Sequence, residues 1–266
     1  MRLLGAPERR IPGSQLSRRR VSGSGDGMQP YLLAPHVYPC ISGQHVVLMD
    51  LERDKYVAVA PAHRLAGWVR GWPVGAMQAT DVPSIADGSL DALVSQMLAH
   101  GMLVSDPSVG KPAVPVTTVR PLRGLVEFDL DTRPRTTASQ LWRFGRSCLR
   151  AQLALKLRPI QSIVEGVRER KARRTAGGSR EADRDRLRAL VTAFARLRPL
   201  FYTLRSACLL DSLTLLHFLS QEDIHPDWVF GVKTEPFDAH CWVQQGDVLL
   251  NDVPDRVRQY SPILVV

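Results

Sequence analysis

Residues 205–220 read RSACLLDSLTLLHFLS, and residues 236–252 read PFDAHCWVQQGDVLLND. These two stretches decide the fold of the last third of the chain. The first has the length and the leucine content of a buried helix, and the second reads as two short strands around Gly246. We therefore predict a helix followed by a hairpin.

Cys208, His240 and Asp252 are the candidate catalytic residues. They appear in the order of a cysteine at the start of an apolar helix, a histidine on one strand and an acid on the next. A cysteine nucleophile needs a base and a third group that orients the base. The order is therefore typical of a Cys–His–Asp triad.

The predicted position of Cys208 favours a thiolate. Ser206 is expected to cap a helix from about Ala207 to Ser220, which places Cys208 in the first turn. Unpaired N–H groups and the helix dipole favour an anion there, and a nearby His⁺ lowers a thiol pKa toward roughly 3.5–7.5. The helix thus supplies both burial and electrostatic activation.

The register of the hairpin decides whether His240 and Asp252 meet. A three-residue loop at 245–247 would oppose them on one face of the sheet, about 5 Å apart at Cβ. A two-residue loop would shift the register by one and place them on opposite faces. The triad therefore predicts the three-residue loop.

The remaining cysteines are expected to pack in cores, which is also the commoner role for any single cysteine, Cys208 included. Cys40 lies in a strand-like run, Cys148 in a basic helix, and Cys241 faces away from His240 on its strand. The chain has no CxxC or HxxxH pair and no GxxxxGK[ST] loop. No metal, nucleotide or other cofactor is predicted.

The segment from Arg205 to Asp252 resembles the B proteins of lasso peptide maturation, which are transglutaminase-like cysteine proteases. The resemblance is carried by Cys208-Leu209 before the leucine-rich helix, VFGV at 229–232, PFDAHCWV at 236–243 and Asn251-Asp252. The usual family pattern at the histidine is Ala-His-Ala-Trp-Val, and Cys241 stands here in place of the second alanine. The resemblance extends over roughly the last half of the chain.

This resemblance implies a transglutaminase/papain-like fold and a leader peptidase. Members remove the leader of a ribosomally made precursor peptide, and a partner cyclase similar to asparagine synthetase then closes a macrolactam ring. By this likeness Cys208 is the nucleophile, His240 the base and then the acid, and Asp252 the orienting group. The Cys208 N–H is one candidate donor to the oxyanion. The exporter of such an antibiotic pathway is a further candidate partner.

The N-terminal third predicts a small α+β domain of winged-helix type. Strands are expected at His36–Ile41, Val46–Asp50 and Lys55–Val59, and helices at Ala62–Trp68 and Leu90–His100. The phrase HVVLMDLERDKYVAVAP at 45–61 resembles the precursor-peptide recognition elements of such pathways. DNA binding is not favoured, because the second helix carries Asp91 and no Lys or Arg.

In that family the leader adds as a strand to an exposed sheet edge and packs against a helix. The predicted leader-binding residues are Lys55, Tyr56, Val57, Ala58 and Val59 on the edge and Leu90, Leu93 and Met97 on the helix. For each apolar residue among them, the alternative is a place in the domain core.

Composition divides the chain into four segments. Residues 1–27 are predicted to be a disordered basic extension without a signal-peptide core, 28–104 the recognition element, 105–136 a linker and 137–266 the protease domain. The net charge is +9. Four cysteines without paired spacing indicate a reducing, cytoplasmic setting, and no run approaches the roughly 18 apolar residues of a membrane span.

Three segments lie between the linker and the helix of Cys208, and the first two are rich in charged residues. Thr137–Lys171 predicts one or two basic helices, Arg168–Asp185 an exposed loop, and Leu187–Leu197 a helix. A basic segment suits an acidic peptide, the cyclase, a membrane surface or nucleic acid, and a solvated face is the commoner explanation.

Two other functions stay open. An acyl or amide transferase uses the same triad with an amine as acceptor in place of water. A precursor-binding chaperone binds without cleaving. The attached recognition element favours the peptidase over the transferase, and the complete triad counts against the chaperone.

Overall fold

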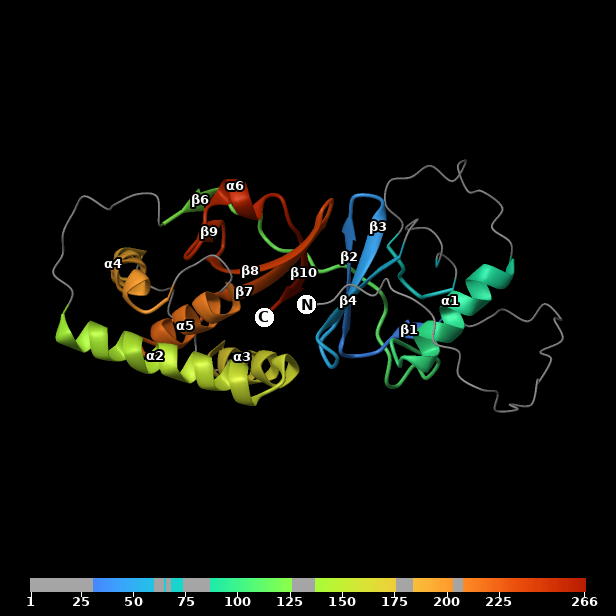
Figure 1. Cartoon of the computed structure of the whole chain (residues 1–266), viewed down its shortest axis with the longest axis horizontal. Coiled ribbons are helices and arrows are strands. Elements are labelled where there is room, and N and C mark those ends of the chain that lie inside the picture. The colour runs from blue at the N-terminus through green and yellow to red at the C-terminus, as the bar shows by residue number, and fades with distance from the viewer. Residues whose placement is uncertain are drawn as a thin grey trace.

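The fold is that of a computed structural model of the whole chain (Figure 1). The structure describes residues 31–59, 65, 68–73, 87–125, 137–175, 184–202 and 208–266, without the side chains of 87–91 and 174–175. Helices and strands are mixed, so the predicted α+β class is confirmed. The predictions for residues 1–27, most of 62–68 and 126–136 lie outside the described residues.

The N-terminal part contains a three-stranded antiparallel sheet and one long helix. Its elements are β1 (Leu32–Leu33), β2 (Val37–Ser42), β3 (His45–Asp50), β4 (Lys55–Val59), α1 (Asp87–Ala99) and β5 (Leu103–Val104). The sheet order is β2-β3-β4, and β1 pairs with β5. The three predicted strands and the second predicted helix are confirmed, and the winged-helix arrangement remains a prediction.

Turn residues and apolar periodicity explain these elements. Gly43 (φ +58°) and Asp54 (φ +51°) turn the chain between the strands in the left-handed conformation that glycine and aspartate tolerate best. Val46 and Leu48 alternate along β3 and pack in one core with Val94 of α1. One face of the sheet therefore holds α1.

The C-terminal part is a five-stranded sheet covered by helices. Its elements are β6 (Arg123–Gly124), α2 (Ala138–Leu157), α3 (Ile160–Thr175), α4 (Arg184–Leu197), the 3-10 turn η3 (Arg198–Leu200), α5 (Cys208–Ser220), β7 (Asp227–Thr234), β8 (Phe237–Gln245), β9 (Val248–Leu249), α6 (Pro254–Val257) and β10 (Ser261–Val265). The sheet order is β10-β7-β8-β9-β6, and only the β6–β9 pair is parallel.

Helix α5 is the centre of this part. It packs between α2 and β8, and Leu213, Leu215 and Leu219 are fully buried. Phe144 and Cys148 on the inner face of α2 join the same core. Because apolar residues surround almost the whole of α5, burial fixes its position, and with it the position of its first residue.

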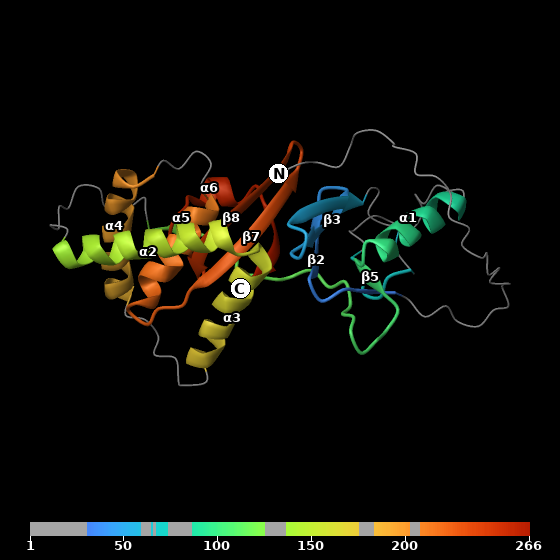
Figure 2. The same cartoon turned by 60° about the horizontal axis from the view of Figure 1, so that its bottom comes forward.

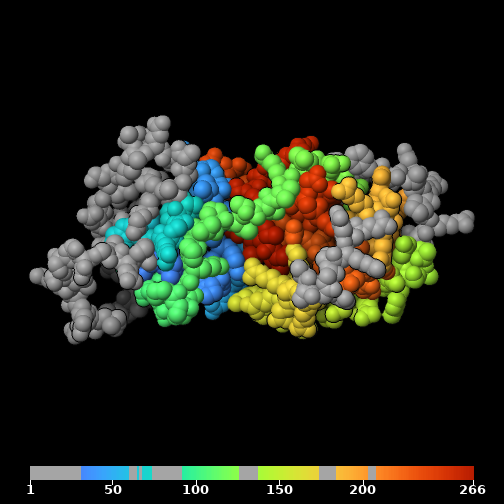
Figure 3. Space-filling view, turned by 180° about the vertical axis from the view of Figure 1, so that it is seen from behind, coloured from blue at the N-terminus to red at the C-terminus, as the bar shows by residue number. Residues whose placement is uncertain are grey.

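The N-terminal and C-terminal parts pack against each other and share one apolar core. Met49 and Leu51 of β3 and its following turn belong to the same apolar cluster as α5 and β8. Across the contact Arg168 donates to the Tyr38 hydroxyl at 2.9 Å, and Ser42 and Thr234 hydroxyls lie 3.4 Å apart. Seen from behind, the green segment before β6 runs over the surface of both parts (Figure 3).

The charged stretch at 168–185 differs from its prediction. We expected a loop, but α3 continues to Thr175 and α4 begins at Arg184, and residues 176–183 lie outside the described residues. Arg, Lys, Glu and Ala are good helix formers, and Glu169 pairs with Arg173 one turn later. Charge density alone therefore does not predict a loop. No described helix combines the length and apolar character needed to cross a bilayer.

Candidate active site

Cys208 is the first residue of α5, in the first helical turn as predicted. Its side chain is partly accessible, whereas Cys40, Cys148 and Cys241 are buried. The amides of a first turn have no acceptor within the helix, so they and the helix dipole stabilise a thiolate here. Ser206, the predicted cap, lies outside the described residues.

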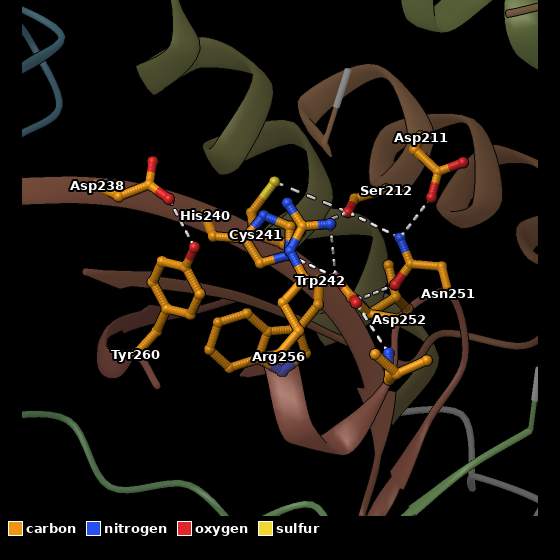
Figure 4. A network of polar contacts seen from close by, with 12 residues as sticks. Asp211, Ser212, Asp238, His240, Cys241, Trp242, Asn251, Asp252, Arg256 and Tyr260 are labelled. Carbon is orange, nitrogen blue, oxygen red and sulfur yellow. Dashed lines mark hydrogen bonds and ion pairs between the residues drawn. The ribbon is translucent and has the colours of Figure 1, made fainter. Parts of the chain in front are cut away.

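His240 and Asp252 are in direct contact. Nε2 of His240, which is buried in β8, lies 2.5 Å from Oδ2 of Asp252, in the turn between β9 and α6 (Figure 4). The other oxygen of Asp252 accepts the Val253 N–H at 2.8 Å. Asp252 is therefore fixed at both oxygens. With Nε2 occupied, Nδ1 is the ring nitrogen available to the Cys208 thiol.

The hairpin that carries these residues has a different register from the predicted one. Val248 pairs with Gln245 and not with Gln244, so the loop has two residues, Gly246 and Asp247. Gly246 has a φ of +59°, the left-handed conformation that two-residue hairpin turns require. The prediction of a three-residue loop was wrong.

His240 and Asp252 nevertheless meet, because the second strand ends early. β9 contains only Val248–Leu249, and the chain then bends out of the sheet. The side chain of Asn251 occupies a sheet position instead, with Oδ1 accepting the Val243 N–H at 2.8 Å. The alternation of faces along a strand no longer constrains Asp252, so the requirement for an odd-numbered loop does not hold.

The thiol and the imidazole have opposite pKa shifts. Hydrogen bonding with Cys241 and with His240, and the His240 charge, lower the pKa of Cys208 to about 4 against the effect of burial. Burial disfavours the imidazolium, but hydrogen bonds with Asp252 and Cys208 raise the pKa of His240 to about 9. Between these pKa values the pair is a thiolate and an imidazolium, the reactive form of a cysteine nucleophile.

Cys241 has two roles in the structure. It is buried, and its sulfur lies 3.7 Å from Ser212 Oγ of α5, so the predicted core position is confirmed. Its thiol also contributes to the lowered pKa of Cys208, which the sequence pattern did not indicate. Among the described residues, no group of three His, Cys, Asp or Glu side chains is arranged to hold a metal ion.

The sequence did not predict a polar network beneath the candidate catalytic residues. Asn251 Nδ2 donates to Asp211 Oδ2 at 2.8 Å and to Ser212 Oγ at 3.1 Å. Asp211 also accepts from the Tyr202 hydroxyl at 3.0 Å and pairs with Arg198 at 3.5 Å. Asn251 thereby joins α5 to β8 and to the turn after β9.

The sequence held one signal for this network. Asp211 and Ser212 are adjacent polar residues on a leucine-rich helix, and a buried acid needs hydrogen-bond partners or a counter-charge. Burial raises the pKa of Asp211, while the Arg198 charge and the Asn251 hydrogen bond oppose that shift. The helix pattern indicated that partners exist, and only the fold identifies them.

Aromatic side chains hold the His240 ring. Its centroid lies 5.2 Å from that of Tyr260 and 6.1 Å from that of Trp242. The Tyr260 hydroxyl donates to Asp238 at 2.6 Å. Gly231 lies opposite His240 in β7, where an added Cβ would come within 2.8 Å of the Trp242 ring. The glycine of VFGV therefore leaves room for the rings that position the imidazole.

β4 (Lys55–Val59) forms one edge of the N-terminal sheet, as predicted, with Ala58 exposed and Val57 half-buried. Its Tyr56 ring lies 5.8 Å from that of Phe237, at the start of β8. Burial raises the pKa of Tyr56, and the charges of Cys241 and Cys208 add to this shift. Tyr56 of the predicted recognition edge and Cys208 thus pack against the same apolar cluster.

The other predicted leader-binding residues lie on α1. Met97 is buried, and Leu93 packs against the same core. The backbone of Leu90 lies in α1, and its side chain is outside the described residues. The structure thus gives Met97 the core position that was the alternative for it.

Residues 145–265, which include the three candidate catalytic residues, match the family model described as Transglutaminase-like superfamily. The chain contains a transglutaminase-like domain. The chain is also similar to the microcin J25-processing protein McjB of Escherichia coli, with 39% identity over 59 residues. That match spans 22% of this chain and 28% of the length of McjB. No solved structure matches the chain significantly.

The thiolate predicts how alkylation depends on pH. We expect iodoacetamide to modify Cys208 rapidly at about pH 6, where an ordinary thiol with a pKa of about 8.5 is almost fully protonated. The rate should fall only as the pH drops through the lowered pKa of the thiol, toward about 4. Timed alkylation followed by peptide mass spectrometry measures this rate for each cysteine.

The matched variant is His240→Ala. It removes a hydrogen bond and a charge that lower the pKa of Cys208, so its alkylation at about pH 6 should slow by about tenfold or more. Cys208→Ser identifies the modified residue. A parent protein whose Cys208 reacts only above about pH 8 would contradict the thiolate.

Asn251→Ala tests the network under the site. The substitution leaves the Val243 N–H and the Asp211 carboxylate each short of a partner, at a cost of about 1–3 kcal/mol for each buried group. Urea unfolding should therefore show a lower free energy of unfolding. Gln259→Ala, which loses only an exposed hydrogen bond, is the control. Equal stability of parent and Asn251→Ala would show that the network does not join these elements.

Proposed function

We propose that this chain is a cysteine peptidase that removes the leader from a ribosomally made lasso precursor peptide. One observation carries the proposal: the Asp252 carboxylate lies 2.5 Å from the His240 imidazole on β8, and Cys208 begins the helix that packs on β8, all within the residues that match the transglutaminase-like model. The similarity to McjB, which is named for the processing of microcin J25, supports lasso precursors as the substrate class.

In the proposed reaction the Cys208 thiolate attacks the carbonyl carbon of the scissile peptide bond and forms a tetrahedral oxyanion. The His240 imidazolium gives its proton to the leaving amine, which departs as the N-terminus of the core, and the leader remains as a thioester. His240 then takes a proton from water, whose oxygen attacks the thioester. The leader leaves with a new carboxylate, and Asp252 orients the imidazole throughout.

The leader is proposed to bind β4, with α1 beside it as the supporting helix. An edge strand offers unpaired backbone groups to an added peptide strand, and the exposed Ala58 and half-buried Val57 leave that edge accessible. The contact between Tyr56 and Phe237 supports a short path from this edge to Cys208. Recognition in the same chain raises the effective concentration of the scissile bond at the thiolate.

The amine released in this reaction is the substrate that a macrolactam-forming cyclase needs. An asparagine-synthetase-like cyclase is therefore the proposed partner, with the exporter of the pathway as a further one and the cytoplasm as the proposed location. The recognition element at residues 28–104 and the protease domain at 137–266 remain the proposed division of labour.

Cys208→Ala should abolish cleavage while leader binding persists. Loss of the nucleophile removes about 10⁴-fold or more of the rate, because the remaining groups form no thioester. The measurement is mass spectrometry of a precursor peptide incubated with each protein, with and without its cyclase, together with leader binding by fluorescence anisotropy. Cleavage should also decline above about pH 9, as His240 loses its proton.

Each alternative has a distinct outcome in this experiment. Normal cleavage by Cys208→Ala would rule out Cys208 as the nucleophile. A precursor that binds but stays whole in every combination would indicate a chaperone, and an amine adduct in place of a cut would indicate transfer. Loss of leader binding in a folded Cys208→Ala protein would undo the separation of recognition from catalysis.

Proline substitutions test β4 as the leader-binding edge. Successive amides of a strand point to opposite sides, so one of Val57 and Ala58 donates outward from the sheet. Val57→Pro and Ala58→Pro are made singly, and the variant that keeps the native circular dichroism spectrum reports on the edge. It should weaken leader binding about threefold to tenfold, the value of one hydrogen bond, and leave Cys208 alkylation unchanged.

Ala58→Ser is the control for this experiment, because it retains the backbone N–H. Unchanged binding by both folded proline variants would rule out strand addition at β4.

A further inference from the structure

Helix α2 has a second apolar face that the fold does not use. Its inner face, with Phe144, Cys148 and Ala151, is buried. On the outer side Trp142 is 74% exposed, and Leu149, Leu153 and Leu157 are 56%, 46% and 72% exposed. Spacings of seven, four and four residues place these four side chains on one stripe, opposite the buried face. Figure 2 shows α2 lying across the front of the C-terminal part.

The charged residues of α2 beside this apolar stripe are all positive. The sequence of α2, ASQLWRFGRSCLRAQLALKL, contains no Asp or Glu, and Arg146, Arg150 and Lys156 are exposed along it. A helix with Trp and Leu on one side and Lys or Arg beside them is typical of segments that lie in the interface of an anionic membrane. The stripe and its cations therefore form a single amphipathic surface, which we call the outer face of α2.

A cavity of about 260 Å³ lies at the end of this face, between α2, α3 and α5. Arg150, Arg158 and Arg170 line it, with Leu153 and Leu157 of the apolar stripe. None of its lining residues is acidic, and no described residue forms an ion pair with these three arginines. Three guanidinium groups around one cavity favour an anion with several oxygens, because each group donates in a fixed fork geometry.

The pKa shifts of Arg170 and His217 agree with a positively charged cavity. Burial, and then the charges of Arg150 and Arg158, lower the pKa of Arg170, and Glu169 offsets part of that shift. Burial and the charges of Arg170 and Arg150 also lower the pKa of His217, which lines the cavity, to about 4. The cavity is therefore strongly positive at neutral pH.

We propose that the outer face of α2 docks on an anionic lipid bilayer. Trp142 and the three leucines enter the boundary between headgroups and acyl chains, and the three arginines of the cavity bind a lipid phosphate. A lipid surface is favoured over a protein partner because Trp142 and Leu149, outside the cavity, are exposed side chains that no groove of the described residues encloses. The cations beside them have no carboxylate that would set the register of a partner chain.

This site is separate from the proposed peptidase activity. The inner face of α2 packs on α5, which carries Cys208, so docking through the outer face leaves the strands of the active site uncovered. Docking through the outer face of α2 would place the proposed peptidase at a membrane surface without a spanning helix.

Vesicle flotation of the full chain is the test. We expect the protein to float with vesicles of phosphatidylcholine and phosphatidylglycerol, not with phosphatidylcholine alone, and to be released by high salt. Leu149→Ser/Leu153→Ser should lower the partition coefficient about tenfold. Arg150→Gln/Arg158→Gln should remove the preference for phosphatidylglycerol. Leu122→Ser, at a 61% exposed position outside α2, should float like the parent.

Trp142 supplies an internal reporter. Trp72, Trp228 and Trp242 are buried, and Trp68 is half-buried in the N-terminal part away from α2, so a blue shift of the emission on vesicle binding should come mainly from Trp142. Trp142→Phe should remove most of the shift and keep flotation. Circular dichroism checks that each variant is folded.

Three outcomes would overturn the proposal. The first is no flotation with phosphatidylglycerol vesicles at low salt. The second is flotation that the Leu149→Ser/Leu153→Ser variant leaves unchanged. The third is a dimer in solution, seen by sedimentation, that this variant dissociates, because the outer face would then be covered by a second copy of the chain.

Discussion

The contact between the His240 imidazole and the Asp252 carboxylate is the constraint on which the rest of the site depends. A buried imidazolium is costly unless an opposite charge faces it. Asp252, fixed at both oxygens, supplies that charge and lets the ring stay protonated beside the Cys208 thiol. The raised pKa of His240 and the lowered pKa of Cys208 are two results of one arrangement, in which carboxylate, imidazolium and thiolate alternate in sign.

The surrounding helices and strands fix the positions of Asp252, His240 and Cys208. Burial of the leucines fixes α5, and the Asn251 side chain joins α5 to β8 where β9 stops. The N-terminal sheet contributes to the same core and brings Tyr56 against Phe237 of the C-terminal sheet. A leader bound on β4, as we propose, would lie beside this contact between the two parts.

Local signals in the sequence predicted the helices and strands better than the register and the contacts between them. The strands at 37–59 and the start of α5 followed from alternation and from the apolar helix, which are local properties. The hairpin register did not, because both loop lengths suit the residues around Gly246. The early end of β9 depends on Asn251, whose partners Asp211 and Val243 come from other elements. Contacts between distant segments are not encoded in periodicity.

In the proposed reaction, water activated by His240 hydrolyses the Cys208 thioester. Cleavage of a lasso precursor in water enriched in oxygen-18 tests this step. We expect a leader fragment whose new carboxylate carries one heavy oxygen, made by the parent protein and not by Cys208→Ala. A leader joined to an amine, or one released without heavy oxygen, would contradict it.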